Sequence, residues 1–219
     1  MVQRSLRARK SVMMFHVLVE GPSDDPTVRE ILTRRFGLSR GGQFQVYPHG
    51  GRGKLPRDPN AAPNFYDRTL FGQLPAKLRA YAEKGLDACI VVLFDQDDDD
   101  CINLLADLHE MLAKLARKPA NILFRIAMEE IEAWFLADQA AITAAYAHAV
   151  FHGVAAGDSD LIDDPSDILA GCLGVSLPCT GQMKAEWAEA IAPYLELESP
   201  HSRSLAKFIE GIARYWKLV

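Results

Sequence analysis

Two hydrophobic runs in this chain each end abruptly at acidic residues. The first covers residues 15–19 and leads into Glu20, and the second covers residues 90–94 and leads into Asp95 and Asp97. Short, unbroken apolar runs are typical of strands buried on both faces of a parallel sheet. If the two strands are neighbours, their carboxylates emerge at the same edge of the sheet, close enough to share a divalent cation.

The composition favours a globular protein without a membrane segment. Of the 219 residues, 49% are hydrophobic, which is enough to bury one substantial core and a small helical appendage. No apolar run approaches the ~18 residues that a membrane span needs, so we expect no membrane contact and a cytoplasmic location. The cysteines follow no metal-ligand or disulfide spacing, and we expect buried free thiols. They are Cys89, Cys101, Cys172 and Cys179.

The charge is distributed unevenly along the chain. The formal net charge is −5, but residues 1–85 contain fifteen Lys or Arg against seven Asp or Glu, whereas residues 86–219 contain nine against twenty-two. This layout suits phosphate-binding segments beside an acidic metal site. The other interpretation is that the charges lie on solvated helix faces.

Strand and helix patterns alternate over the first two thirds of the chain. We expect strands over residues 15–19, 44–47, 87–94 and 122–126, each followed by a helical segment. The first helix opens with an acidic N-cap in Asp24-Asp25-Pro26. The later helical segments cover residues 74–84, 101–117 and 129–147. This alternation predicts an α/β fold with a mostly parallel sheet flanked by helices. Glu20 can meet Asp95 only if the strand order is 2-1-3-4. We assign residues 12–147 to this domain and residues 148–219 to a helical C-terminal subdomain, with helices over 165–173, 182–195 and 202–216.

The acidic residues at the strand ends suit Mg²⁺ or Mn²⁺, which take oxygen ligands. Glu20, Asp95 and Asp97 are the expected metal ligands and catalytic residues. Asp98, Asp99 and Asp100 either cap the next helix or hold a second ion, and we include Asp99 among the candidate ligands. Glu130 shares a face with Trp134 if both lie on the predicted helix, so Glu130 or Glu132 is either a further ligand or part of a salt-bridged helix.

A glycine-rich basic loop is the candidate for phosphate contacts. Arg52 and Lys54 alternate with glycines in residues 50–54, which gives backbone freedom and two cations. The spacing is not that of a P-loop, and a merely solvated loop is the alternative. Lys184 and Arg203 are weaker candidates for nucleic-acid contacts, with a plain surface role as the other interpretation.

The glutamate motif at residues 19–24 and the D-x-D motif at residues 93–97 resemble the two signatures of the Toprim superfamily. That superfamily occurs in topoisomerases, primases, RNA-maturing nucleases and nucleases of the overcoming-lysogenization-defect (OLD) type. The segment around Glu130 and Trp134, together with the Gly-rich loop, resembles the uncharacterised prokaryotic DUF4276 family, and this likeness extends through Lys184 and residues 202–208. The resemblance implies a Toprim- or Rossmann-like sheet, Glu20 as metal ligand or general acid/base, Asp95 and Asp97 as Mg²⁺ ligands, and neighbouring ATPases in phage-defence loci.

Three functions remain open from the sequence. The first is a Mg²⁺-dependent nuclease acting on DNA or RNA, since 219 residues leave no room for the extra domains of a topoisomerase or primase. The second is a non-catalytic module that binds metal, nucleic acid or a partner within a larger complex. The third is phosphoryl transfer on a small molecule with Asp95 as nucleophile. The amphipathic C-terminal helices leave a homodimer open.

Overall fold

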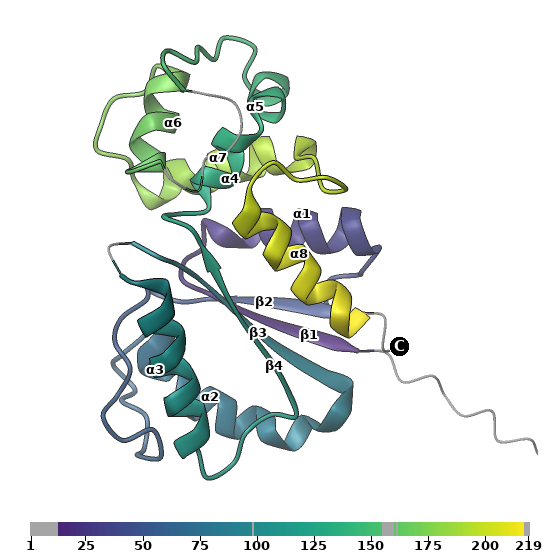
Figure 1. Cartoon of the computed structure of the whole chain (residues 1–219), viewed down its shortest axis with the longest axis vertical. Coiled ribbons are helices and arrows are strands. Elements are labelled where there is room, and N and C mark those ends of the chain that lie inside the picture. The colour runs from purple at the N-terminus through teal and green to yellow at the C-terminus, as the bar shows by residue number, and fades with distance from the viewer. Residues whose placement is uncertain (1–12, 98, 155–159, 161, 217–219) are drawn as a thin grey trace, which may run out of the picture.

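A four-stranded parallel sheet forms the centre of the computed structural model, which describes residues 13–97, 99–154, 160 and 162–216 (Figure 1). The strand order is β2-β1-β3-β4, as the sequence predicts. The strands are β1 (Met14–Val19), β2 (Phe44–Pro48), β3 (Ala88–Asp95) and β4 (Asn121–Ala127). The predicted α/β fold with flanking helices is therefore confirmed.

The register of the sheet brings the predicted acidic positions to one edge. Leu18 of β1 pairs with Val92 of β3, and Val92 pairs with Phe124 of β4. Since all these pairs are parallel, the chain leaves β1 at Glu20, β3 at Asp95 and β4 beyond Ala127 in the same direction. Ligands of open α/β sheets bind at this carboxyl edge.

Helices cover both faces of the sheet (Figure 1). On one face, α1 (Asp24–Phe36) and α8 (Arg203–Trp216) pack against alternate strand residues such as Val17. On the other, α2 (Leu70–Tyr81) and α3 (Cys101–Lys114) pack against residues such as Ile90. Successive side chains of a strand point to opposite faces of the sheet, so one continuous apolar run contributes side chains to two separate cores.

The C-terminal helices extend the first of these cores. Among the described residues between β4 and α8, the α-helices are α4 (Glu132–Ala137), α5 (Gln139–Ala145), α6 (Pro165–Leu173) and α7 (Gly181–Ile191). Trp134 and Trp187 from these helices belong to the same buried cluster as Val17 of β1. The predicted helix over 165–173 is confirmed residue for residue. The start of the predicted domain, residue 12, lies outside the described residues.

Several predicted boundaries were wrong. The helix expected over residues 74–84 begins at Leu70, because the Thr69 side chain accepts a hydrogen bond from the Gly72 N–H as an N-cap. That helix ends at Tyr81, and a 3-10 segment, η1 (Ala82–Asp87), follows it. The helix expected over residues 101–117 ends at Lys114, since Leu115 is already extended.

The regions after β1 and β4 also differ from the expectation. Ser23, not an aspartate, occupies the N-cap position of α1, and its side chain makes no cap hydrogen bond. Glu130 precedes α4 instead of lying on it, because the chain turns at Glu129, whose φ is 57°. Glu130 and Trp134 therefore do not share a helical face. Trp134 is fully buried, and its indole N–H donates to Ser204 Oγ at 2.7 Å.

All four cysteines are free thiols, as expected, although only Cys89 and Cys172 are buried and the other two are half-exposed. Within the described residues, no helix is both long and apolar enough to cross a membrane.

Candidate functional site

The carboxyl edge of β1 and β3 brings two predicted site residues into direct contact. Glu20 Oε1 accepts a 3.0 Å hydrogen bond from the backbone N–H of Asp95. The Glu20 carbonyl accepts a second bond, 2.9 Å long, from the Gly51 N–H, which ties the glycine-rich loop to the same strand end. Glu20 thus connects three segments that are distant in the sequence.

Asp24 contributes a further carboxylate that the sequence reasoning treated only as part of a helix cap. Its side chain is 7% exposed and accepts hydrogen bonds from the Gly21 N–H at 2.9 Å and from Ser23 Oγ at 3.1 Å. The turn after Glu20 therefore folds back over the Asp24 carboxylate and buries it beside Asp95. The spacing of Asp24 after Glu20 was a signal for this role, but it fits a helix start equally well.

Two more carboxylates arrive from the segment after β4. Glu130 Oε1 lies 2.6 Å from Lys184 Nζ, and Glu132 Oε2 lies 3.8 Å from the same nitrogen. Glu130 Oε2 also accepts a 3.2 Å hydrogen bond from the Ser166 N–H at the start of α6. Lys184 is therefore paired with the acids of the site and is not an isolated surface cation.

Five acidic residues gather at this edge of the sheet, and we call them the carboxylate cluster. Burial raises the pKa of Glu20 to about 7, with smaller contributions from Asp97 and Asp24, and it raises the pKa of Asp24 to about 6. Burial and then the charges of Asp24, Glu20, Glu132 and Glu130 raise the pKa of Asp95 well above its usual range. The members of the cluster are Glu20, Asp24, Asp95, Glu130 and Glu132.

Lys184 offsets this negative charge only in part. Burial raises the pKa of Glu132 to about 7 even though Lys184 opposes the shift. Burial acts to lower the pKa of Lys184, but Glu132 and Glu130 outweigh it and the pKa is raised. The cluster thus gathers an excess of carboxylates, which is a site that attracts a cation.

Arg52 organises the acidic loop that follows β3. Its guanidinium donates to the backbone carbonyls of Asp95 at 3.0 Å and Gln96 at 2.8 Å, and it also pairs with the carboxylates of Asp97 and Asp99. Asp97 adopts a left-handed φ of 48°. In this conformation Arg52 holds the predicted ligands Asp97 and Asp99 in place. A phosphate that binds Arg52 would therefore compete with these two carboxylates.

An open cleft of about 570 Å³ lies over this loop. Its walls include Arg52, Lys54, Asp97, Asp99 and Glu130. Lys54 is exposed in the structure and stands at the cleft. Five of the predicted site residues therefore line one cleft, and Glu130 links it to the carboxylate cluster.

The donor chemistry of this region fits a hard divalent cation, but the side chains are not arranged as a finished ligand set. Mg²⁺ and Mn²⁺ prefer carboxylate oxygens and keep several waters. Among the residues that the structure describes, no three Asp, Glu, His or Cys side chains form a group that could hold a metal ion as they stand. A cation would therefore require side-chain rotations, for example of Glu130 away from Lys184.

The remaining predicted residues lie elsewhere. Arg203 begins α8 and lines a different pocket, and Asp98 lies outside the described residues. Asp100 caps α3 by accepting a hydrogen bond from the Asn103 N–H. His49 Nδ1 bonds to the Val19 carbonyl at 2.8 Å, which is a structural contact beside the loop.

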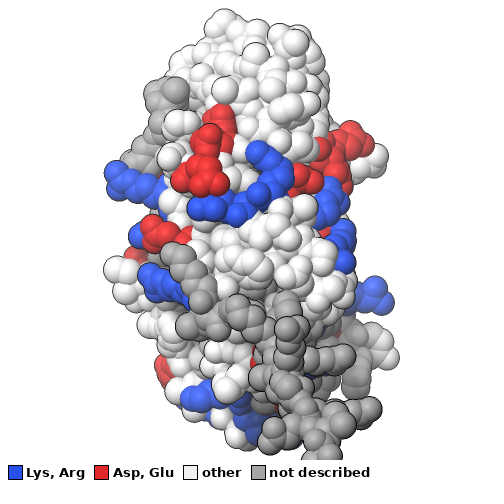
Figure 2. Space-filling model, turned by 90° about the vertical axis from the view of Figure 1, so that its right-hand side faces the viewer, with Lys and Arg blue, Asp and Glu red and all other residues white. Residues whose placement is uncertain are grey.

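The surface on the α1 and α8 side of the molecule carries charges of both signs. Figure 2 views the right-hand side of Figure 1 and shows basic and acidic groups intermixed in a band. Two ion pairs agree with this mixing: Arg29 of α1 pairs with Glu189 of α7, and Arg35 of α1 pairs with Glu198, which precedes α8. Part of the basic excess in residues 1–85 lies in residues 1–12, outside the described part of the chain.

Comparison with known proteins identifies one family. The family model described as "Domain of unknown function (DUF4276)" matches residues 19–170, a range that contains Glu20, the glycine-rich loop, Asp95 and the acids after β4. It ends before Lys184 and Arg203. Neither a curated protein nor a solved structure matches the chain. Because the matched range covers more than half of the 219 residues, this chain belongs to the DUF4276 family.

Proposed function

We propose that this chain is a metal-dependent nuclease of the Toprim type that hydrolyses phosphodiesters of DNA or RNA. The observation that carries the proposal is the carboxylate cluster at the carboxyl edge of β1 and β3, where burial raises the pKa of Glu20 to about 7. A site with more buried carboxylates than cations destabilises the folded state, so a purely structural role does not explain it. Such an arrangement is typical of sites that serve a ligand.

We assign metal-holding and proton-carrying roles to residues of the cluster and of the acidic loop after β3. Asp95 and Asp97 would hold Mg²⁺ or Mn²⁺, with Asp99 and Glu130 as further ligands. When bound, the ion polarises the phosphodiester and favours deprotonation of an attacking water. Glu20 carries the proton on Oε2, since Oε1 accepts the Asp95 N–H and a pKa of about 7 suits a group that both takes and releases protons near neutral pH.

The glycine-rich loop would orient the nucleic-acid strand. Lys54 stands at the cleft with its side chain exposed, where it can contact a phosphate. Arg52 holds the backbone of Asp95 and Gln96 in place through its two bonds to their carbonyls, and it would keep these bonds when a phosphate displaces one of its carboxylate partners.

The test is cleavage by the purified protein with Mg²⁺ or Mn²⁺ on a panel of single- and double-stranded DNA and RNA. We expect cleavage that falls by about a hundredfold or more in Glu20→Gln and Asp95→Asn. Glu110→Gln is the matched control, because Glu110 is an exposed acid of α3 that pairs with Lys114 and lies outside the cleft. Cleavage that survives in Asp95→Asn would refute the proposal.

A non-catalytic binding module is the second candidate, and one observation favours it. Lys184 already neutralises Glu130 at 2.6 Å, which gives part of the cluster a cation without any metal. A folded protein that binds Mg²⁺ or nucleic acid but cuts no member of the panel, even with an ATPase partner added, would favour this role. The ATPase partner, the setting in phage defence and a homodimer are proposals that rest on the family resemblance and on the amphipathic C-terminal helices.

A further inference from the structure

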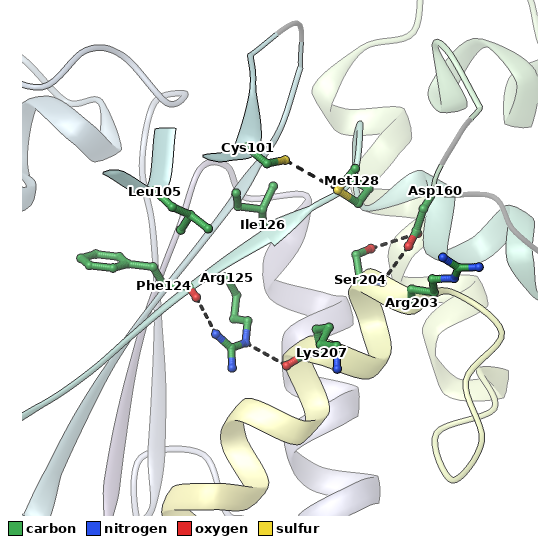
Figure 3. Close-up of a pocket in the computed structure, with 10 residues that line it drawn as sticks. All are labelled: Cys101, Leu105, Phe124, Arg125, Ile126, Met128, Asp160, Arg203, Ser204 and Lys207. Carbon is green, nitrogen blue, oxygen red and sulfur yellow. Dashed lines mark hydrogen bonds between the residues drawn. The ribbon is translucent and has the colours of Figure 1, made fainter. Parts of the chain in front are cut away.

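A second pocket, of about 480 Å³, lies between α3, the outer strand β4 and α8 (Figure 3). One wall is apolar and consists of side chains from α3, β4 and the residues just after β4. These are Leu105, Phe124, Ile126 and Met128. The rim carries three cationic side chains, Arg125, Arg203 and Lys207.

The charges of this pocket favour an anion. Asp160 is the acid in its lining, and its carboxylate is consumed by hydrogen bonds from Ser202 Oγ at 2.8 Å and from the N–H and Oγ of Ser204 at 2.8 and 3.0 Å. Asp160 is 6% exposed, so it is a buried cap of α8 and not a group that faces the ligand space.

Arg125 is held in place at the pocket by the backbone. Its guanidinium donates to the carbonyl of Phe124 at 2.7 Å and to that of Lys207 at 2.8 Å, as Figure 3 shows. These partners are carbonyls, so they leave its positive charge unneutralised. Lys207 pairs with Glu210 at 2.9 Å, but both side chains are more than half exposed, and such surface pairs are weak.

The pocket and the acidic cleft have no lining residue in common, but they are lined by neighbouring residues of the same two chain segments. Cys101, in the pocket lining, is two residues after Asp99 of the cleft, and Met128 directly precedes Glu129 and Glu130. The Cys101 and Met128 sulfur atoms lie 3.7 Å apart, so the two segments meet between the pocket and the cleft. A strand that lies in the cleft would therefore have its neighbouring nucleotide within reach of the pocket.

We propose that this pocket is a nucleotide subsite that takes an unpaired nucleobase against the apolar wall and its phosphate on Arg125 and Lys207. A planar, largely apolar ring joined to an anion matches an apolar wall beside a cationic rim, and bases stack on apolar and aromatic side chains without a sequence requirement. The assignment of the nucleotide to a substrate strand rests on the proposed function, whereas binding of a nucleotide here does not.

The test is isothermal titration calorimetry without divalent cations, so that no cleavage occurs. The probes are nucleoside 5′-monophosphates, the matching nucleosides, inorganic phosphate and a short single-stranded oligonucleotide. We expect the monophosphates or the oligonucleotide to bind more tightly than nucleoside or phosphate alone. Tighter binding of the oligonucleotide identifies a strand as the source, and equal binding identifies a free nucleotide.

Charge reversal at the rim locates the site. Lys207→Glu should weaken this binding by about tenfold or more. Lys114→Glu should change it by less than about twofold, because Lys114 is a similarly exposed lysine with an acidic partner on α3, outside the pocket. Leu105→Glu places a carboxylate in the apolar wall and should abolish binding while the circular dichroism spectrum shows the fold intact.

Three results would overturn the subsite: no binding of any nucleotide probe, phosphate binding as tightly as the monophosphates, or an unchanged affinity in Lys207→Glu. Failure of the nuclease assay with this binding intact would refute the proposed function alone. Cleavage that is retained while Lys207→Glu leaves the nucleotide affinity unchanged would refute the subsite alone.

Discussion

Glu20 and Asp95 lie 75 positions apart in the chain, and the Glu20 carboxylate accepts a 3.0 Å hydrogen bond from the Asp95 N–H. The bond exists because β1 and β3 are parallel neighbours that end at the same edge. It places a half-buried carboxylate against the backbone of the second acidic segment, and the stability of the protein should therefore depend on the protonation of this site.

The first prediction concerns the pH dependence of stability at Glu20. Its pKa is raised from 4.5 to about 7 in the folded protein, so the folded state favours the protonated form, and stability is lost as pH rises from about 4.5 through 7. Glu20→Gln keeps the oxygen that accepts the Asp95 N–H but cannot ionise. Its free energy of unfolding should match the wild type near pH 5 and exceed it by about 1–3 kcal/mol at pH 8.

Chemical denaturation at the two pH values measures this difference. Glu110→Gln is the control, because the ion pair with Lys114 lowers the pKa of Glu110, and any pH effect there should be small and of opposite sign. A Glu20→Gln variant that is less stable than the wild type at pH 8 would contradict the assignment.

The second prediction is that Mg²⁺ or Mn²⁺ stabilises the protein. At millimolar concentration the ion should raise the free energy of unfolding at pH 8 by about 1–3 kcal/mol, as expected for a ligand that binds only the folded state. The effect should be smaller at pH 5, where protons compete for the raised-pKa carboxylates. Thermal unfolding with and without the ion measures it. The shift should vanish in Asp95→Asn and persist in Glu110→Gln; an equal shift in all three proteins would indicate non-specific binding.

The third prediction concerns Lys184, which pairs with Glu130 and Glu132. Lys184→Met removes this charge and leaves the acids uncompensated, so it should destabilise the protein by about 1–3 kcal/mol at pH 8. The loss should be smaller at pH 5, because burial raises the pKa of Glu132 to about 7 and this acid is then protonated. Lys114→Met removes an exposed lysine and should change stability by less than about 0.5 kcal/mol. An effect of Lys184→Met that is identical at both pH values would show that only its packing matters.

The fourth prediction separates backbone strain from crowding in the glycine-rich loop. Gly51 and Gly53 have φ values of 90° and 69°, where a side chain is strained. A Cβ at Gly51 would meet nothing within 4 Å, whereas at Gly53 it would lie 2.0 Å from Thr69 Oγ1, the N-cap of α2. Gly51→Ala should cost about 1 kcal/mol, and Gly53→Ala should cost roughly 1–2 kcal/mol more. Urea denaturation of both variants decides the point, and equal losses would mean that Thr69 moves aside freely.

Much of the fold could be predicted because it depends on local pattern. The run over residues 90–94 is short, apolar without interruption and rich in β-branched residues, which is typical of a strand buried on both faces. The boundaries near Leu70 and Lys114 could not be predicted, since they depend on the Thr69 cap and on the extended backbone of Leu115.

The site was predictable only where acids follow a strand directly. Glu20 and Asp95 satisfy this rule, and the parallel register then brings them together. Asp24 and Glu132 are also buried in the cluster, yet in the sequence each has the pattern of an ordinary acid near a helix start. The sequence pattern around Lys184 is that of a surface lysine. Lys184 pairs with Glu130 only because α7 packs near the segment after β4.

By itself, the sequence determined that two apolar strands end in acid and that β and α elements alternate, because these properties depend on neighbours in the chain. Only the tertiary structure decided which acids become buried, which cation compensates them and where Arg52 lies. Burial and Coulomb interaction depend on distance in space, and residues such as Glu130 and Lys184, 54 positions apart, acquire their roles only when the helices pack.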